Sequence, residues 1–199
     1  IDIAGTVESI AQITPEYLYQ CYHTFYNLHN MVLCVAGKVK VEEVCQLADR
    51  MLKPAPAIQV ERIFQEEPRE IVKERVKQRL AVTVPLFQFG FKEPACQTRT
   101  SMKDLACMEI LLDVMASDCS PLFRRLLDAE LINESSFSYD YFEGPGYASV
   151  IFSGESKNPQ EVAKQIRQEV SRLRKTGIDP VAFERSKRAL YGRNISVLN

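Results

Sequence analysis

The amino-acid sequence predicts an α+β fold, in which helices pack on one face of an antiparallel or mixed sheet. One observation is a hairpin pattern: strand-like segments at 136–142 and 147–153 flank a turn sequence at 143–146. The other is an amphipathic helical pattern over 158–177 that is bounded by proline and glycine. A hairpin combined with long helices is typical of an α+β protein.

Residues 1–53 are predicted to form a helix, a strand and a second helix. Thr14 is a favourable N-cap and Pro15 a favourable first helical residue, so the first helix is expected to begin there. The run at 30–37 is almost wholly apolar and ends at a glycine, which predicts a buried strand. Residues 41–52 carry apolar side chains at helical spacing and are predicted to form the second helix.

A proline-containing and then glutamate-rich segment at 54–68 interrupts the helical pattern. Proline ends helices, and polar stretches of this kind connect structural units, so the segment is predicted to be a linker. The chain is therefore expected to divide into a first part at 1–53, the linker, and a second part at 69–199.

From residue 69 to residue 84, apolar side chains alternate with basic ones. This predicts a long strand, or two strands in tandem, with one buried and one basic face. Pro85 interrupts the pattern, and the alternating phenylalanines at 87–91 continue it with shifted parity, as expected at a bulge or bend. The basic face is interpreted as a solvated sheet face, with anion or nucleic-acid binding as the alternative. Its members are Lys73, Arg75, Lys77 and Arg79.

Four helical segments are predicted after residue 100. Ser101 and Asp104 have the spacing of a capping box and precede apolar residues at helical spacing. Further helices are expected at 121–131, at 158–177 and from 179 towards 198. The apolar stripe of the third is predicted to face the core and consists of Val162, Ile166, Val170 and Leu173.

Composition excludes several classes of function. The net charge of −1 argues against nucleic acid and anionic membranes as partners. No apolar run approaches the roughly 18 residues that a membrane helix needs. The cysteines form no C-x-x-C pair and are predicted to be buried reduced thiols, not zinc ligands or disulfides. They are Cys21, Cys34, Cys45, Cys96, Cys107 and Cys119.

Residue types that carry catalysis are sparse. Zinc sites need clustered histidine, cysteine or carboxylate ligands, but His23 and His29 are the two histidines and have no nearby ligand partner. Neither His-x-x-Glu-His nor His-Glu-x-x-His occurs, and no Gly-x-Ser-x-Gly sequence marks a serine nucleophile. Both histidines are interpreted as surface or capping residues, and no catalytic or metal residue is predicted.

The order of several short motifs resembles the insulinase/pitrilysin-type zinc metallopeptidases, the inverzincins, which include the mitochondrial processing peptidase. The matching elements are Gly5-Thr6 with Ser9-Ile10, Ile13-Thr14-Pro15, residues 25–31, the segment that ends at Gly37, and residues 120–126. Later motifs at 154–159, 183–185 and 191–193 look closest to a bacterial branch of this family.

This resemblance implies a protein in which two similar α+β halves close around a peptide. The zinc ligands of such a protein belong to its first half and would precede Ile1, so we expect this chain to be a fragment. Residues 1–53 would then end the catalytic-type half, and 69–199 would be an incomplete, non-metal second half that forms part of the peptide-enclosing chamber. Zinc is expected only in the parent protein, provided that the upstream motif is present, and the segment alone is expected to be inactive.

The family's second half often contributes an arginine and a tyrosine that hold substrate near the metal. When the pattern Leu-Phe-x-x-x-Arg is registered on 122–123, these positions fall on Leu127 and Glu134. Leu127 can neither donate a hydrogen bond nor pair with a charge, and Glu134 would repel a substrate that carries a carboxylate. The remaining candidates for substrate contact are Arg124, Arg125 and Glu134.

The replaced pair leaves an alternative open, in which the parent is a catalytically inactive homologue that acts as a peptide- or protein-binding scaffold. The expected partners are a peptide or protein substrate, the missing first half of the same chain, and a second copy in a homodimer. Neither nucleic acid nor membrane is expected as a partner, and the bacterial cytoplasm is the expected location.

Overall fold

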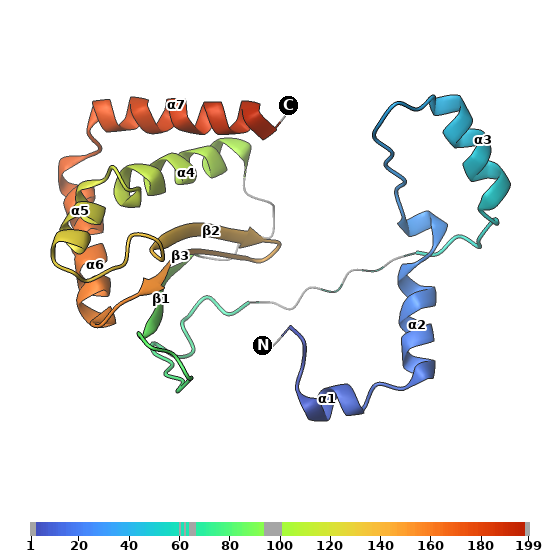
Figure 1. Ribbon diagram of the computed structural model, residues 1–199, viewed down its shortest axis with the longest axis horizontal. Helices are drawn as coiled ribbons and strands as arrows, with labels where there is room; N and C mark the ends of the chain where they lie inside the picture. Colours follow the sequence, from blue (N-terminus) through green and yellow to red (C-terminus); the bar gives the residue numbers. More distant parts are fainter. Residues whose placement is uncertain (1–2, 60, 62, 64–66, 94–100, 198–199) are drawn as a thin grey trace. The chain divides into compact units, whose positions relative to one another are not determined.

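The computed structural model describes residues 3–59, 61, 63, 67–93 and 101–197 (Figure 1). The chain divides into two compact units, Ile1–Ile63 and Phe64–Asn199.

Unit 1 contains α1 (Val7–Ala11), α2 (Pro15–Phe25), the short 3-10 helix η1 (Leu28–Asn30) and α3 (Val41–Met51). The predicted start of α2 is confirmed, because Thr14 Oγ1 accepts a hydrogen bond from the Tyr17 N–H at 3.2 Å and Pro15 is the first helical residue. Asn27 ties the end of this region to the later chain by donating from Nδ2 to the Pro56 carbonyl at 3.3 Å.

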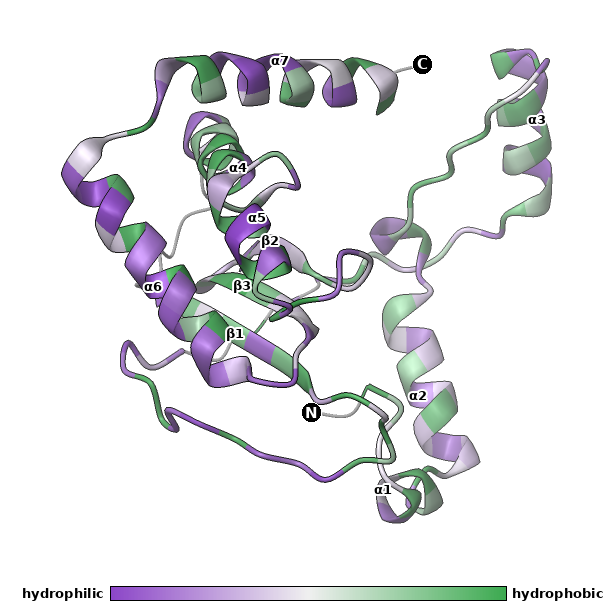
Figure 2. Ribbon diagram, turned by 60° about the vertical axis from the view of Figure 1, so that its left-hand side comes forward, coloured by the Kyte–Doolittle hydropathy of each residue, from purple (hydrophilic) through white to green (hydrophobic). Residues whose placement is uncertain are grey.

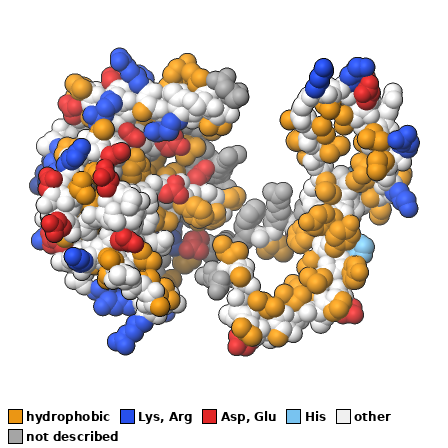
Figure 3. All heavy atoms as spheres, in the orientation of Figure 1, with side chains coloured by type: hydrophobic (Ala, Val, Ile, Leu, Met, Phe, Trp, Pro, Cys, Tyr) orange, Lys and Arg blue, Asp and Glu red, His pale blue; other side chains and the backbone are white. Residues whose placement is uncertain are grey.

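The predicted buried strand at 30–37 is wrong. Residues 31–36 have no regular secondary structure, and Val32 and Leu33 are 88% and 65% exposed. A strand obtains its backbone hydrogen bonds from a neighbouring strand, and the described part of unit 1 contains no other strand. Apolar side chains therefore remain on the surface of this unit, as the space-filling view shows (Figure 3).

Unit 2 is built on a three-stranded antiparallel sheet with the order β1-β3-β2. The strands are β1 (Leu86–Glu93), β2 (Ser138–Gly144) and β3 (Tyr147–Glu155), and β2 and β3 form the predicted hairpin. Gly146 in its turn has φ +85°, a left-handed conformation that glycine adopts without strain. Phe152 of β3 pairs with Phe89 on one side and with Tyr139 on the other, so aromatic side chains line one face of the sheet.

In the described part of unit 2, four helices accompany this sheet: α4 (Met102–Ala116), α5 (Pro121–Asp128), α6 (Pro159–Thr176) and α7 (Pro180–Val197). Helix α4 contacts β2, α5 and α7, while α6 contacts β1 and α5 (Figure 1). The predicted cap of α4 is confirmed, since Ser101 Oγ accepts from the Asp104 N–H at 3.1 Å. The α+β prediction is confirmed.

An apolar core joins the sheet to α4, α5 and α6. Phe152, Leu122 and Leu126 are fully buried in it. The predicted stripe of α6 is confirmed. Val162 and Ile166 are also fully buried, and Val170 and Leu173, one and two turns later, are partly buried against the core. The opposite face of α6 is hydrophilic (Figure 2).

The predicted strand over 69–84 is wrong. This segment contains bends but no strand, and Val72 and Val76 are 80% and 75% exposed. The first strand of the sheet begins only after Pro85, whose carbonyl accepts a hydrogen bond from the Ser156 N–H at 3.0 Å. Alternation alone cannot make a strand where no neighbouring strand supplies the hydrogen bonds. The predicted continuation through the phenylalanines at 87–91 is confirmed as part of β1.

The predicted burial of the cysteines is also wrong. Cys34, Cys45, Cys107 and Cys119 are exposed, and Cys21 is half-buried. Cys45 and Cys107 each lie one residue away from the apolar stripe of their helix, and one residue turns the side chain by roughly 100° around the helix axis. All five are free thiols, and Cys96 lies outside the described residues.

Candidate functional site

A small hollow of about 170 Å³ lies where the end of α4, the start of α5 and β2 meet. One of the sequence-predicted contact residues, Glu134, lies on its wall. The lining residues are Ala116, Ser117, Asp118, Phe123, Glu134, Phe137 and Tyr139.

The α4–α5 connection sets one wall of the hollow. Ser117 leaves the helix in an extended conformation while its N–H still donates to the Asp113 carbonyl at 3.1 Å. Ser120 is fully buried and caps α5, because its Oγ accepts from the Phe123 N–H at 3.1 Å. These bonds hold the short turn tightly and leave Asp118 exposed.

A turn before β2 sets the opposite wall. Asn133 Oδ1 accepts from both the N–H and the Oγ of Ser135, at 3.1 and 3.0 Å, which is the geometry of an Asx-turn. Glu134 lies inside this turn and is exposed to solvent. Phe137 and Tyr139 follow at the two-residue period of a strand and pack against the core.

Tyr139 connects the hollow to α4 and α7. Its Oη donates to Asp113 Oδ1 at 3.3 Å, and Arg193 Nη1 lies 3.6 Å from the same oxygen. Burial raises the pKa of Tyr139 to about 12; the Asp113 carboxylate and, more weakly, Asp118 act in the same direction, whereas Arg193 opposes them. The phenol is therefore neutral at physiological pH and serves as a hydrogen-bond donor.

The other sequence-predicted contact residues do not line this hollow. Arg124 is exposed on α5, and Leu127, at the family's arginine position, packs against the core. Arg125 turns towards α6, where its Nη2 lies 2.5 Å from Glu169 Oε2. The structure thus brings only Glu134 of these residues to the hollow.

Glu169 is 2% exposed and is held by two arginines. Arg172 reaches its Oε1 with Nη2 at 2.7 Å and with Nε at 3.1 Å, while Arg125 reaches the other oxygen. Burial by itself would raise the pKa of Glu169, but the hydrogen bonds from Arg172 and Arg125 outweigh it and leave the pKa below its ordinary value. This ion-paired group joins α5 to α6.

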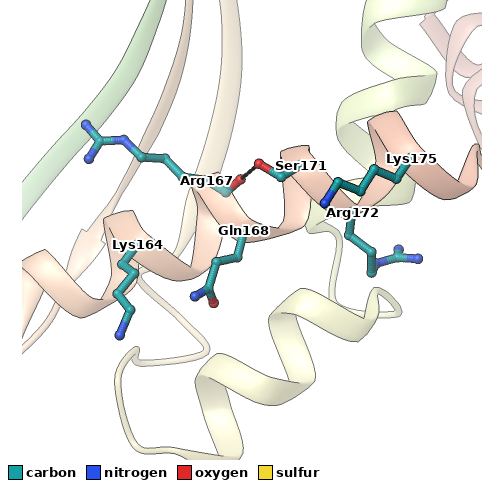
Figure 4. Close-up of a pocket in the computed structure, with 6 residues that line it drawn as sticks. All are labelled: Lys164, Arg167, Gln168, Ser171, Arg172 and Lys175. Atoms are coloured by element: carbon teal, nitrogen blue, oxygen red, sulfur yellow. Dashed lines mark hydrogen bonds between the residues drawn. The ribbon is translucent and has the colours of Figure 1, made fainter.

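The outer face of α6 forms a second, open hollow of about 500 Å³, whose lining side chains all come from this helix (Figure 4). Several of its cations are already engaged. Lys164 pairs with Glu161 at 3.2 Å, and the Arg167 guanidinium lies 4.9 Å from the centroid of the Phe89 ring. Its lining residues are Lys164, Arg167, Gln168, Ser171, Arg172 and Lys175. We interpret it as a solvated helix face.

Zinc does not fit the residues that the structure describes. Among them, no group of three or more histidine, cysteine or acidic side chains is placed to hold a metal ion. His23 is exposed on α2 beside Tyr19 and Tyr22, and His29 Nε2 lies 3.1 Å from the Ala55 carbonyl oxygen. None of the described helices combines the length and apolarity needed to cross a membrane.

Sequence reasoning missed Ser117 and the Tyr139–Asp113 pair. The alternation of Phe137, Tyr139 and Tyr141 with polar residues could have placed Tyr139 on the core face. Asp113 is an acidic residue within the otherwise apolar end of α4, and this position could have indicated that it accepts a hydrogen bond there, which Tyr139 donates. Ser117 carried no sequence signal, because its role depends on how the α4–α5 turn is folded.

The sheet, its covering helices and the hollow define an α+β domain. The family model described as the peptidase M16 inactive domain matches residues 12–190. The chain belongs to the peptidase M16 family, and the resemblance to insulinase-type metallopeptidases is thereby confirmed.

Individual relatives agree with this assignment. The chain is 30% identical over 171 residues to the uncharacterized zinc protease YmfH of Bacillus subtilis (strain 168), covering 83% of this chain and 40% of that protein. It superposes on the crystal structure of an M16-like peptidase from Alicyclobacillus acidocaldarius with a TM-score of 0.84 and 32% identity, over 100% of this chain and 48% of that one.

A protease from Helicobacter pylori shares the fold at a TM-score of 0.74 and 19% identity, over 96% of this chain and 47% of that one. The chain thus spans about half the length, or less, of these relatives.

Proposed function

We propose that this chain forms part of the wall of a peptide-enclosing chamber in a longer zinc-peptidase-like protein, and that the hollow beside Glu134 contacts the enclosed peptide. The observation that carries the proposal is the position of Glu134. It occupies the family's expected substrate-holding tyrosine position and lines a hollow between two helices and the sheet. The relatives' names, a zinc protease and an M16-like peptidase, support a peptide as the ligand.

Zinc and hydrolysis would belong to the remainder of the longer protein. The described residues offer no ligand group for the metal, so this chain would supply contacts and exclude water but would not activate the attacking water. A homodimer of this chain and a location in the bacterial cytoplasm are further proposals.

The experiment uses the purified 199-residue chain and a fluorescently labelled unstructured peptide. Anisotropy measures binding, mass spectrometry measures cleavage, and metal analysis measures zinc. We expect saturable binding without cleavage and without stoichiometric zinc. Cleavage of the peptide, or one tightly held zinc ion per chain, would contradict the proposed role.

A catalytically inactive scaffold is the second candidate. Leu127 and Glu134 favour it, because they stand where active members are expected to carry arginine and tyrosine. The two candidates differ in the longer protein, for which zinc-dependent cleavage supports the peptidase and peptide binding without cleavage supports the scaffold.

A further inference from the structure

We propose that residues 67–75 form a strap that covers the free edge of strand β1, and that this edge pairs with β1 of a second copy of the chain when the strap is released. The strap would thus control self-association through the sheet. This device is independent of the peptide contact proposed at Glu134, and either can hold without the other.

One edge of β1 has no strand beside it. The sheet has the order β1-β3-β2, so β1 pairs with β3 on one side and, within the described part of the chain, with no strand on the other. Residues 86–91 of β1 contain three phenylalanines and one leucine, and neither a charged side chain nor a proline. Uncharged apolar segments of about six residues at a sheet edge tend to pair with another chain, so this edge needs a cover.

The first end of the strap is tied to the end of β1. Lys92, the last residue but one of this strand, donates from Nζ to Glu67 Oε1 at 2.9 Å and also to the Pro68 carbonyl. The Lys92 side chain is 23% exposed, so the ion pair is partly shielded from solvent. Partly buried pairs are screened less by salt than exposed ones, and this tie should therefore persist at physiological ionic strength.

The second end of the strap is tied beside the start of β1. In the orientation of the Gln160 amide that lets its oxygen accept, Arg75 Nη1 and Nη2 donate to that oxygen at 2.7 and 2.8 Å. Gln160 lies in the first turn of α6. The chain just before this helix is held to the start of β1, because the Ser156 N–H donates to the Pro85 carbonyl at 3.0 Å. The strap therefore runs from the end of β1 to its start, antiparallel to the strand.

The strap and the strand match in length but are not joined by a backbone ladder. Pro68 and Arg75 are seven residues apart, as are Lys92 and Pro85. The strap contains bends and no strand, so the two ties at its ends hold it in place. Six of its nine residues are charged, and charged side chains over an edge discourage pairing with a further strand. Such a cover can be released without breaking the sheet.

A second copy of β1 is complementary to the released edge. When two β1 strands pair antiparallel about a two-fold axis centred on Phe89, this residue lies opposite its equivalent, and Phe87 lies opposite Phe91 of the second copy. Aromatic pairs across neighbouring strands stabilise a sheet. Lys92 then lies opposite Leu86, so no like charges meet in this pairing. The two three-stranded sheets would become one continuous sheet.

The test releases the strap without changing β1 or the net charge. Glu67→Gln and Arg75→Gln together remove one acid and one base, each from a different tie. Sedimentation velocity over a range of concentrations measures the self-association constant of the 199-residue chain and of this double variant. We expect association to become roughly fivefold stronger, because each tie makes a modest net contribution to holding the cover closed.

The matched control is the double variant Glu70→Gln with Lys73→Gln. It also removes one acid and one base from exposed positions of the strap, but neither residue belongs to a tie. Its association constant should equal that of the natural chain. Equal association of the natural chain and the released variant would overturn the inference, as would an equal gain in the control.

A third substitution assigns the association to the edge of β1. Gln88 is exposed on this strand, and in the proposed pairing the two copies of residue 88 lie diagonally across the two-fold axis. Gln88→Lys, added to the released variant, places like charges there and should restore the association constant of the natural chain. Hydrogen exchange should show that residues 86–91 of the released variant become protected as its concentration rises.

Two further outcomes would refute β1 as the associating surface. One is association that survives Gln88→Lys, as the aggregation of an unfolded chain would. The other is protection that rises with concentration outside residues 86–91 but not within them.

Discussion

Arg125 on α5 and Glu169 on α6 form an ion pair in which Nη2 of the arginine lies 2.5 Å from Oε2 of the glutamate. The glutamate side chain is 1% exposed, whereas that of Arg125 is 46% exposed, so the pair reaches from the interior to the surface. Arg172 holds the other oxygen of the same carboxylate. The two helices that flank the core are therefore joined by charge as well as by apolar packing.

Arg125→Ala is expected to lower the free energy of unfolding by about 1–3 kcal/mol, because it removes one charged hydrogen bond from a buried carboxylate. Arg172 remains and limits the loss. Urea unfolding followed by circular dichroism measures the change. Arg124→Ala is the matched control, since this exposed neighbour on α5 should cost less than about 0.5 kcal/mol. Equal losses in the two variants would show that the ion pair contributes nothing.

Glu169 should make unit 2 less stable in acid. The pKa of Glu169 in the folded state is below its ordinary value. At pH values between the folded-state and unfolded-state pKa, the unfolded chain therefore binds more protons than the folded chain. The stabilisation is fully present above the unfolded-state pKa and is lost as pH falls through the folded-state pKa. The free energy of unfolding, measured from about pH 7 to about pH 3, should fall less steeply in Glu169→Gln than in the natural chain. Parallel curves would contradict the assignment.

Phe152→Ala is expected to lower the free energy of unfolding by about 3–5 kcal/mol, because it opens a cavity at a fully buried position between the sheet and the helices. Phe142→Ala on the adjacent strand is the control. Phe142 is 52% exposed and stacks on Tyr147 with ring centroids 5.5 Å apart, so its loss should cost about 1 kcal/mol or less. Comparable losses would mean that Phe152 does not lie at the centre of the core.

Tyr139 should ionise later than an ordinary tyrosine. Its pKa is raised from 10.0 to about 12, so an absorbance titration should show ionisation of a phenol at about pH 12 that is missing in Tyr139→Phe. Because the folded-state pKa is the higher one, the associated stability is present below the unfolded-state value of 10.0 and is lost as pH rises towards about 12. If the phenol that Tyr139→Phe removes instead titrates at about the ordinary value of 10.0, the buried hydrogen bond to Asp113 is refuted.

Part of the candidate site was predictable from sequence. Glu134 was identified by its register on Leu122 and Phe123, and the structure places it on the wall of the hollow. The partner of Arg125 was not predictable, because Glu169 lies 44 residues later and nothing in the local pattern pairs them. A contact of this kind arises only when α5 and α6 pack together.

By itself, the sequence determined the features that depend on neighbouring residues. The caps at Thr14 and Ser101, the apolar stripe of α6 and the β2–β3 hairpin were all predicted, since each depends on hydrogen bonds or side-chain periods within a few residues. Tertiary structure decided whether the apolar segment at 30–37 and the alternating segment at 69–84 became strands, because a strand needs backbone partners that its own residues cannot supply. It likewise decided that the turn at Ser117 would meet Glu134 across one small hollow.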